Sequence, residues 1–142
     1  MSERRGRVWE APGDREVFSL PLEVRPEDID ANGHVNNVVY VRWLQEAGTA
    51  HWLARFGPEV TGRWSWIALR HEIDYLRPLR PGDAARARTW VGTPQGARFE
   101  RVVVINGPEG PAAQGRSDWV LVDAASLKPA RIPGWMAEPF RR

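Results

Sequence analysis

The chain has 142 residues, enough for one domain with a hydrophobic core. Its charge is nearly balanced, with 20 Lys and Arg residues against 18 Asp and Glu residues, and the basic residues are scattered, so we expect no nucleic-acid partner. The absence of cysteine excludes disulfides and thiolate metal sites, and no apolar run could cross a bilayer or act as a secretory signal. We therefore expect a cytoplasmic protein with no membrane partner.

The first residues predict a short tail and an edge strand. Residues 1–14 lack hydrophobic periodicity and are expected to form a flexible N-terminal tail, followed by one domain over residues 15–134 and a C-terminal tail at 135–142. Residues 16–25 alternate apolar and polar side chains, as a half-buried strand does. Because Pro21 cannot donate to a β ladder, this strand is expected at a sheet edge or a bulge.

A polar loop separates this strand from a long apolar segment. The loop combines acids, amides and an imidazole at Asp28, Asp30, Asn32, His34, Asn36 and Asn37. The segment after it repeats apolar side chains at helical spacing on nearly every side, which indicates a largely buried helix of roughly 30 Å. Asn36 or Asn37 can cap its start, and Gly57 followed by Pro58 is expected to stop it.

Four further strands are predicted after the helix. They cover residues 66–76, 84–91, 97–105 and 112–122, and turn-forming residues separate them. Strands joined by tight turns favour an antiparallel sheet, so the pattern is that of an α+β protein. A helix that is apolar on nearly every side requires a curled sheet or a second subunit to cover it. We therefore expect a homodimer or a dimer of dimers.

The loop and helix carry a resemblance to a known family. The motif reads Asp30-Ala-Asn32-Gly-His34-Val-Asn36-Asn37, followed by Tyr40 and Trp43. It resembles the motif of hotdog-fold thioesterases, and is most similar to the acyl-carrier-protein thioesterases and the 4-hydroxybenzoyl-CoA-type acyl-CoA thioesterases. Segments 74–83, 119–123 and 129–133 resemble the ends of later strands of that family. The resemblance covers roughly residues 15–134.

The resemblance implies a fold, an assembly and a set of site residues. The implied hotdog fold is a five-stranded antiparallel sheet wrapped around one long central helix, with dimers joined through a continuous sheet. By position, Asp30 matches the catalytic acid of the family, and Asn32 and His34 match the amide and imidazole of the carrier-protein branch. In the hydroxybenzoyl-type enzymes a backbone N–H at the helix start polarises the thioester carbonyl, and here that group belongs to Asn37.

One departure from the carrier-protein branch favours a simpler site. That branch has a further proposed carboxylate or cysteine at a place that falls near Pro78 and Leu79, and this chain has no cysteine. A one-acid scheme with Asp30 is therefore expected. A positioned carboxylate can attack the thioester to form an anhydride, or can deprotonate a water, and the sequence leaves both roles open.

The other loop residues have two readings each. His34 either orients Asp30 or the substrate, or only ties down the loop. Asn32 either serves the reaction or only tolerates a left-handed loop conformation. The side chains of Asn36 and Asn37 are interpreted as helix caps rather than catalysts.

The remaining polar candidates are interpreted as structural. Asp28 is expected to be a solvated or turn-making acid and Glu46 a solvated one, while His51 and His71 are expected in the core or an interface. The three histidines lack the spacing of a metal site, so we expect no metal and no cofactor.

The sequence thus predicts a thioester hydrolase acting on an acyl-CoA or acyl-ACP substrate. Two alternatives stay open. A hotdog enoyl-CoA hydratase or dehydratase uses a similar loop, but with a proline and one more residue before the histidine. The second alternative is a non-catalytic acyl-CoA-binding or regulatory module.

Overall fold

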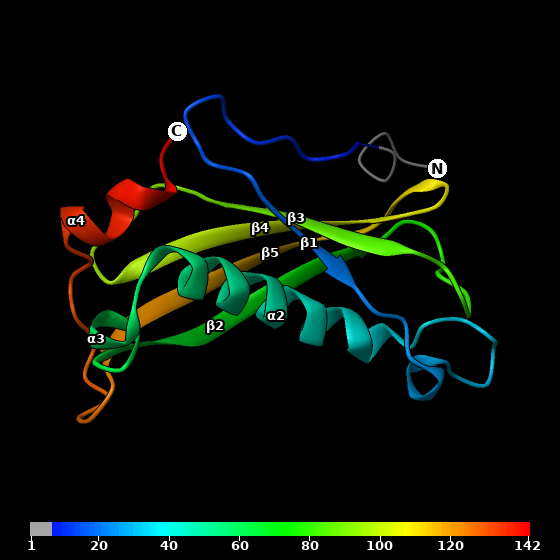
Figure 1. Ribbon diagram of the computed structural model, residues 1–142, viewed down its shortest axis with the longest axis horizontal. Helices are drawn as coiled ribbons and strands as arrows, with labels where there is room; N and C mark the ends of the chain where they lie inside the picture. Colours follow the sequence, from blue (N-terminus) through cyan, green and yellow to red (C-terminus); the bar gives the residue numbers. More distant parts are fainter. Residues whose placement is uncertain (1–6) are drawn as a thin grey trace.

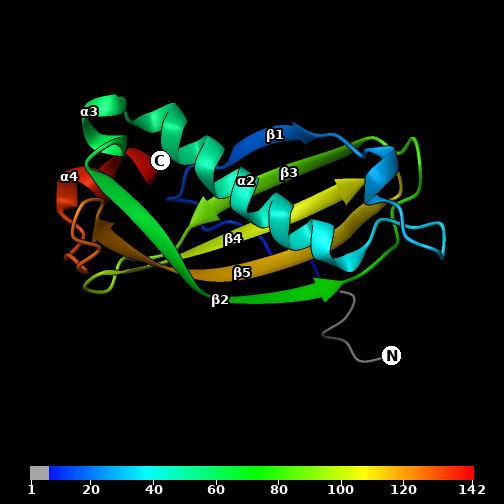
Figure 2. The same cartoon turned by 90° about the horizontal axis from the view of Figure 1, so that it is seen from below.

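The computed structural model describes residues 7–142, so part of the tail predicted for residues 1–14 lies outside the described residues. Five strands form one antiparallel sheet in the order β1-β3-β4-β5-β2. Their bounds are β1 Phe18–Leu22, β2 Trp64–Tyr75, β3 Ala85–Val91, β4 Arg98–Gly107 and β5 Gly110–Asp123. The long helix α2, Asn37–Arg55, lies across one face of the curved sheet (Figure 1), and Figure 2 shows it crossing that face obliquely. The predicted α+β architecture is confirmed.

The helix begins and ends where the sequence predicts. Asn36 is the N-cap, and its Oδ1 accepts from the backbone N–H of Val38 at 3.1 Å. The helix ends at Arg55 with Phe56 as its C-cap, so Gly57 and Pro58 follow its end directly, where the sequence places the stop. They begin a second short helix, α3, Pro58–Thr61, because the fixed φ of proline suits a first helical position. Across the described residues, no helix is long and apolar enough to span a membrane.

The two edges of the sheet are formed by β1 and β2. β1 is one edge, in line with Pro21, and within residues 7–142 it pairs only with β3, with Pro21 opposite Arg86. β2 is the other edge, and its outer rim has no strand partner within the described chain. The β4–β5 turn is tighter than the sequence indicates, because the ladder continues to Gly107 opposite Gly110.

The helix buries one side and leaves apolar groups on another. Its inward side places Tyr40, Trp43, Leu44 and Ala47 in the core against the sheet. Apolar side chains also remain exposed on the helix and on β2, so the expectation of burial on nearly every side is not met within one chain. These side chains are Val38, Leu53, Ile67 and Leu69, which are between 43% and 69% exposed.

Both segments that the sequence assigns to tails contact the domain where they are described. Val8, Trp9 and Ala11 pack on the face of the sheet opposite α2, and Figure 1 shows this segment running along that side. At the other terminus, the short helix α4, Gly134–Ala137, and the turn η2, Glu138–Phe140, bury Met136 and Phe140. Their apolar side chains, too few to show a period, fill the open end between α2 and the sheet.

Candidate functional site

The loop before α2 is a small hairpin held by backbone hydrogen bonds. Ile29 and Val35 form an antiparallel bridge that closes it. Inside the hairpin, the N–H of Asp30 donates to the carbonyl of His34 at 2.9 Å, and the N–H of Gly33 donates to the carbonyl of Asp30 at 3.0 Å. Gly33 has φ +78°, a backbone conformation that glycine adopts without strain. The loop is therefore ordered by its own backbone, which leaves its polar side chains available.

The side chain of Asp30 is partly engaged in this hairpin. Its Oδ1 accepts from the N–H of Asn32 at 2.9 Å, which forms a turn of the Asx type. Among the described residues no cation pairs with Asp30, and no hydrogen bond joins its carboxylate to the side chain of Asn32 or His34. The structure brings the three side chains into one loop without linking them into a hydrogen-bonded triad.

The first turn of α2 presents one free backbone donor. The N–H of Val38 is capped by the side chain of Asn36, and the N–H of Val39 donates to the Asn36 carbonyl at 2.9 Å. Within residues 7–142, the N–H of Asn37 has no hydrogen-bond partner. The first N–H groups of a helix carry partial positive charge, so this donor suits an oxygen that gains negative charge. The hydroxyl of Tyr75 donates to the carbonyl of Asn37 at 3.1 Å, so the helix start lies beside the end of β2.

Asp28 is a buried ion-pair partner, which corrects the expectation of a solvated acid. Its side chain is 2% exposed and accepts both guanidinium N–H groups of Arg42, at 3.0 and 3.1 Å. Its Oδ2 also accepts the N–H of Arg25 at 2.9 Å, so the turn-making part of the expectation is met. The hydrogen bonds from Arg42 lower the pKa of Asp28. This pair attaches the loop to the second turn of α2.

Replacing Asp28 with Asn is expected to lower stability by about 2 kcal/mol at pH 7, because a largely buried charge-assisted pair is lost. The folded-state pKa of Asp28 is depressed, so its contribution is present above the pKa of the unfolded chain and is lost as pH falls through the folded pKa. Chemical denaturation of both proteins measures the difference. It should shrink steadily between about pH 5 and pH 2. An equal difference at pH 7 and pH 2 would contradict the assignment.

The loop is also anchored to the turn that follows β2. The N–H of Val35 donates to the carbonyl of Leu79 at 2.8 Å, and Leu79 is 2% exposed. The place where the carrier-protein branch has a further proposed acid or cysteine is thus taken by a buried apolar side chain. It supports the loop and supplies no second carboxylate.

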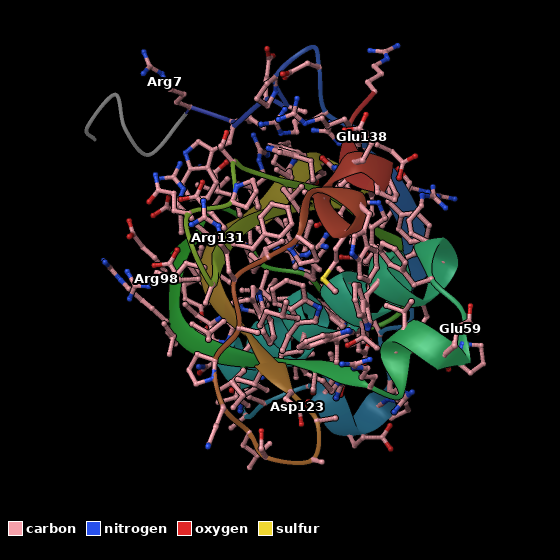
Figure 3. The ribbon with its side chains drawn as sticks, turned by 90° about the vertical axis from the view of Figure 1, so that its left-hand side faces the viewer. Arg7, Glu59, Arg98, Asp123, Arg131 and Glu138 are labelled. Carbon is pink, nitrogen blue, oxygen red and sulfur yellow. The ribbon has the colours of Figure 1, made fainter. Side chains whose placement is uncertain are left out.

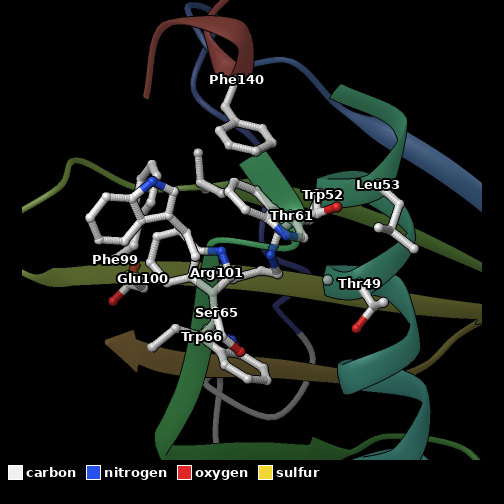
Figure 4. A pocket seen from close by; sticks show the side chains of 14 residues that line it. Thr49, Trp52, Leu53, Thr61, Ser65, Trp66, Phe99, Glu100, Arg101 and Phe140 are labelled. Carbon is white, nitrogen blue, oxygen red and sulfur yellow. The ribbon is translucent and has the colours of Figure 1, made fainter. Parts of the chain in front are cut away.

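A second polar cluster, Glu16, His51 and Arg101, lies at the far end of α2, and of these residues the sequence analysis singles out only His51. His51 is fully buried, in line with the expectation of a core residue. Its Nε2 meets Glu16 Oε1 at 2.7 Å and its Nδ1 meets Arg101 Nη1 at 3.0 Å. Arg101 was missed, although the signal was available: it is the one charged residue at an inward position of an otherwise apolar segment, 101–105. Figure 4 shows it projecting into a cavity lined by aromatic side chains.

The other expected structural residues are placed as follows. His71 is partly buried, its Nδ1 lies 2.6 Å from the hydroxyl oxygen of Ser117, and burial lowers its pKa. Glu46 is exposed and pairs with Arg42 at 3.3 Å. Among residues 7–142 no group of three or more His, Cys, Asp or Glu side chains could hold a metal ion.

Comparisons with known proteins agree with this architecture. A family model described as the Thioesterase-like superfamily matches residues 24–140. A thioesterase from Thermus thermophilus, solved with coenzyme A and Zn, is 24% identical, with 91% of this chain and 94% of that chain covered and a TM-score of 0.76. A predicted thioesterase from Bacillus stearothermophilus is 24% identical over 88% and 94% of the two chains, with a TM-score of 0.78. A 1,4-dihydroxy-2-naphthoyl-CoA thioesterase from Synechocystis is 20% identical over 86% and 94%, with a TM-score of 0.72. At these identities the structures establish a shared fold.

Proposed function

The chain belongs to the Thioesterase-like superfamily, and from this premise we propose that it hydrolyses acyl-CoA thioesters, with acyl carrier protein as the alternative thiol. The observation that carries the proposal is that a carboxylate without a cation partner and a backbone N–H without an acceptor lie in the same loop and helix start. Asp30 lies in the ordered loop just before α2, and the N–H of Asn37 begins that helix without a partner among the described residues. A thioester hydrolase needs these two groups: one to supply or activate an attacking oxygen, and one to hold the oxyanion.

In the proposed reaction, the thioester carbonyl oxygen accepts from the N–H of Asn37. Such a donor, aimed at developing charge, contributes on the order of 3 kcal/mol to transition-state stabilisation. Asp30 either attacks the carbonyl carbon, which gives a mixed anhydride that water then cleaves, or it takes a proton from the water that attacks. On either route the C–S bond breaks, the thiolate leaves, and the acyl group ends as a free acid.

His34 and Asn32 are assigned supporting roles. His34 is half-buried, and its backbone carbonyl accepts from the N–H of Asp30 in the hairpin; we assign its imidazole to orienting Asp30 or the substrate. The exposed amide of Asn32 can contact bound substrate, and its backbone N–H holds Asp30 Oδ1.

We also propose that the active form is a homodimer joined along the free edge of β2. Ile67 and Leu69 on this strand are 43% and 49% exposed, and Leu53 on α2 is 57% exposed, which is apolar surface that a second copy would cover. Strand pairing across this edge also satisfies the backbone groups that β5 leaves open. Antiparallel pairing of two β2 strands brings the Tyr75 end of each to the Trp64 end of the other.

A steady-state assay over a panel of acyl-CoA esters, with released thiol as the readout, tests the proposal. Aliphatic and aromatic esters should be included, with EDTA present and with an enoyl-CoA hydration control. Hydrolysis of at least one ester with normal saturation kinetics is expected. Hydration without hydrolysis would instead favour the hydratase alternative, and binding without turnover would favour a non-catalytic module.

A further inference from the structure

A cavity of about 270 Å³ lies between the C-terminal half of α2 and the beginning of β2. Its lining includes six aromatic side chains: Trp52, Trp64, Trp66, Phe99, Trp119 and Phe140. Figure 4 shows the rings of Trp52, Trp66, Phe99 and Phe140 around the space beside α2. The cavity is at the opposite end of the helix from the Asp30 loop. From Asn37 to Trp52 the helix advances by roughly 22 Å. A short acyl group bound at the Asn37 N–H therefore cannot reach the cavity of the same chain.

One cation is buried in this aromatic cavity. Arg101 is 7% exposed, and its Nη1 donates to Thr89 Oγ1 at 3.0 Å and to His51 Nδ1 at 3.0 Å. Among the described residues, its Nε and Nη2 have no hydrogen-bond partner, and no carboxylate lies within 4 Å of it. Gly48 allows this placement, because a Cβ there would lie 3.2 Å from Arg101 Cδ. A nearly buried guanidinium thus turns one unpaired edge toward a cavity.

The groups around Arg101 leave its guanidinium protonated but do not accept hydrogen bonds from all of its N–H donors. Burial and the neighbouring Arg101 charge lower the pKa of His51 to about 4, so the imidazole is neutral. Its Nε2–H donates to Glu16, which leaves Nδ1 to accept from Arg101. Burial lowers the pKa of Arg101 to about 10, so the guanidinium stays protonated at neutral pH. The Glu16 carboxylate is bonded by Arg55 at 2.6 Å and reaches Arg101 only through the imidazole.

The other polar groups of the cavity do not neutralise Arg101. Glu100 lies along the cavity wall but contacts Arg116 at 3.8 Å, and Figure 4 shows its carboxylate turned away from the guanidinium. Trp119 also lines the cavity, and its indole N–H is buried without a hydrogen-bond partner among the described residues. A cavity with a buried positive charge and an unpaired guanidinium edge favours an anionic ligand.

The β2 edge connects this cavity to the proposed site. Trp64 and Trp66, at the beginning of β2, line the cavity, whereas Tyr75, at its end, bonds to Asn37 at the helix start. In an antiparallel dimer along β2, the cavity of one chain therefore faces the helix start of the other. A thioester held at the partner's Asn37 would extend its acyl group toward Arg101.

We propose that this cavity binds the acyl group and that Arg101 selects acyl groups with a carboxylate at the end remote from the thioester. The proposal rests on the proposed thioesterase function and dimer. The free edge of a guanidinium offers two parallel N–H donors, Nε–H and Nη2–H, which match the two oxygens of a carboxylate. The aromatic walls hold the apolar body of the chain and exclude water, which strengthens the charge pairing. Arg101 is then a specificity-determining residue, and Glu16 and His51 are its positioning residues.

The test compares charged and neutral acyl groups of matched length. Values of kcat/KM are measured for the series from succinyl-CoA to suberyl-CoA and for the corresponding unsubstituted acyl-CoA esters. The parent should prefer the best ω-carboxyacyl ester over its unsubstituted match. Arg101→Met should reduce this ratio at least about thirtyfold, the lower range for removing one partner of a buried hydrogen-bonded charge pair. Arg98→Met is the matched control on the same strand, since Arg98 points outward (Figure 3), and it should leave the ratio unchanged.

The outcomes separate the inference from the function on which it rests. Hydrolysis with no preference for any ω-carboxyacyl ester, or a ratio unchanged by Arg101→Met, would overturn the inference and leave the thioesterase proposal intact. Absence of hydrolysis for every ester would overturn both. If circular dichroism shows that Arg101→Met is unfolded, Arg101→Lys replaces it, and loss of the paired donors should reduce the ratio at least about fivefold. An unchanged ratio in a folded Arg101→Lys protein would also overturn the inference.

Discussion

Asp30→Asn is expected to lower kcat by at least about 100-fold with the best acyl-CoA ester, the lower range for losing a general base. The amide keeps the size of the side chain and can still accept from the N–H of Asn32, so the hairpin should persist. It loses both nucleophilic and basic character, which removes both proposed roles. KM should change little, because the thioester is held mainly by groups outside this carboxylate. Single-turnover and steady-state kinetics on the folded variant measure the effect.

Asp123→Asn is a matched control for this substitution. The Asp123 carboxylate accepts the N–H groups of Ala125 and Ser126, both at 2.9 Å, in a turn like that of Asp30 but at the end of β5 rather than before α2. It should keep full activity, and His34→Ala should fall between the two aspartate variants. If Asp30→Asn retains activity within fivefold of the parent, the acid must be sought elsewhere, with Glu46 on α2 as the next candidate.

Ile67→Asp combined with Leu69→Asp is expected to yield a monomer with at least about 100-fold lower kcat/KM. Two added carboxylates on each β2 edge would place like charges close together in the paired strands, and such charges across a sheet are destabilising. The isolated chain would keep its helix start and its cavity, but at opposite ends of α2. Misplacement of the reacting groups by even a small distance can cost about 100-fold in rate. Sedimentation at micromolar concentration measures the assembly, and the acyl-CoA assay measures the activity.

Leu127→Asp provides the control for the dimer variant. Leu127 is 60% exposed in the turn after β5 and has φ +60°, a conformation that aspartate tolerates better than leucine. It should change neither assembly nor activity. A double variant that remains dimeric would refute pairing along β2. A folded monomeric double variant with parental activity would refute a site shared between two copies.

The sequence by itself determined the elements that depend on local pattern. A helix start capped by Asn36 or Asn37, four strands between residues 66 and 122, and an edge or bulge position for the strand containing Pro21 all follow from spacing, capping and a missing N–H donor, and the structure bears them out. Each of these signals lies within one element, so it depends only on residues that are neighbours in the sequence. The same holds for the position of the Asp30 loop, because a polar hairpin before a helix start is a contiguous feature.

Only the tertiary structure decided which polar groups pair and which remain free. From the sequence, Asp28 is expected to be a solvated or turn-making acid. In the fold, Arg42, 14 residues later, forms an ion pair with it. The alternation of residues 101–105 places Arg101 on the inward side of its strand, but only strand order brings it beside His51, 50 residues away in sequence, with no carboxylate within 4 Å among the described residues. Charge pairing and burial depend on how strands and helix assemble, which no periodicity encodes. For the same reason, the exposed apolar edge at Ile67 and Leu69 became visible only once the sheet was seen to end at β2.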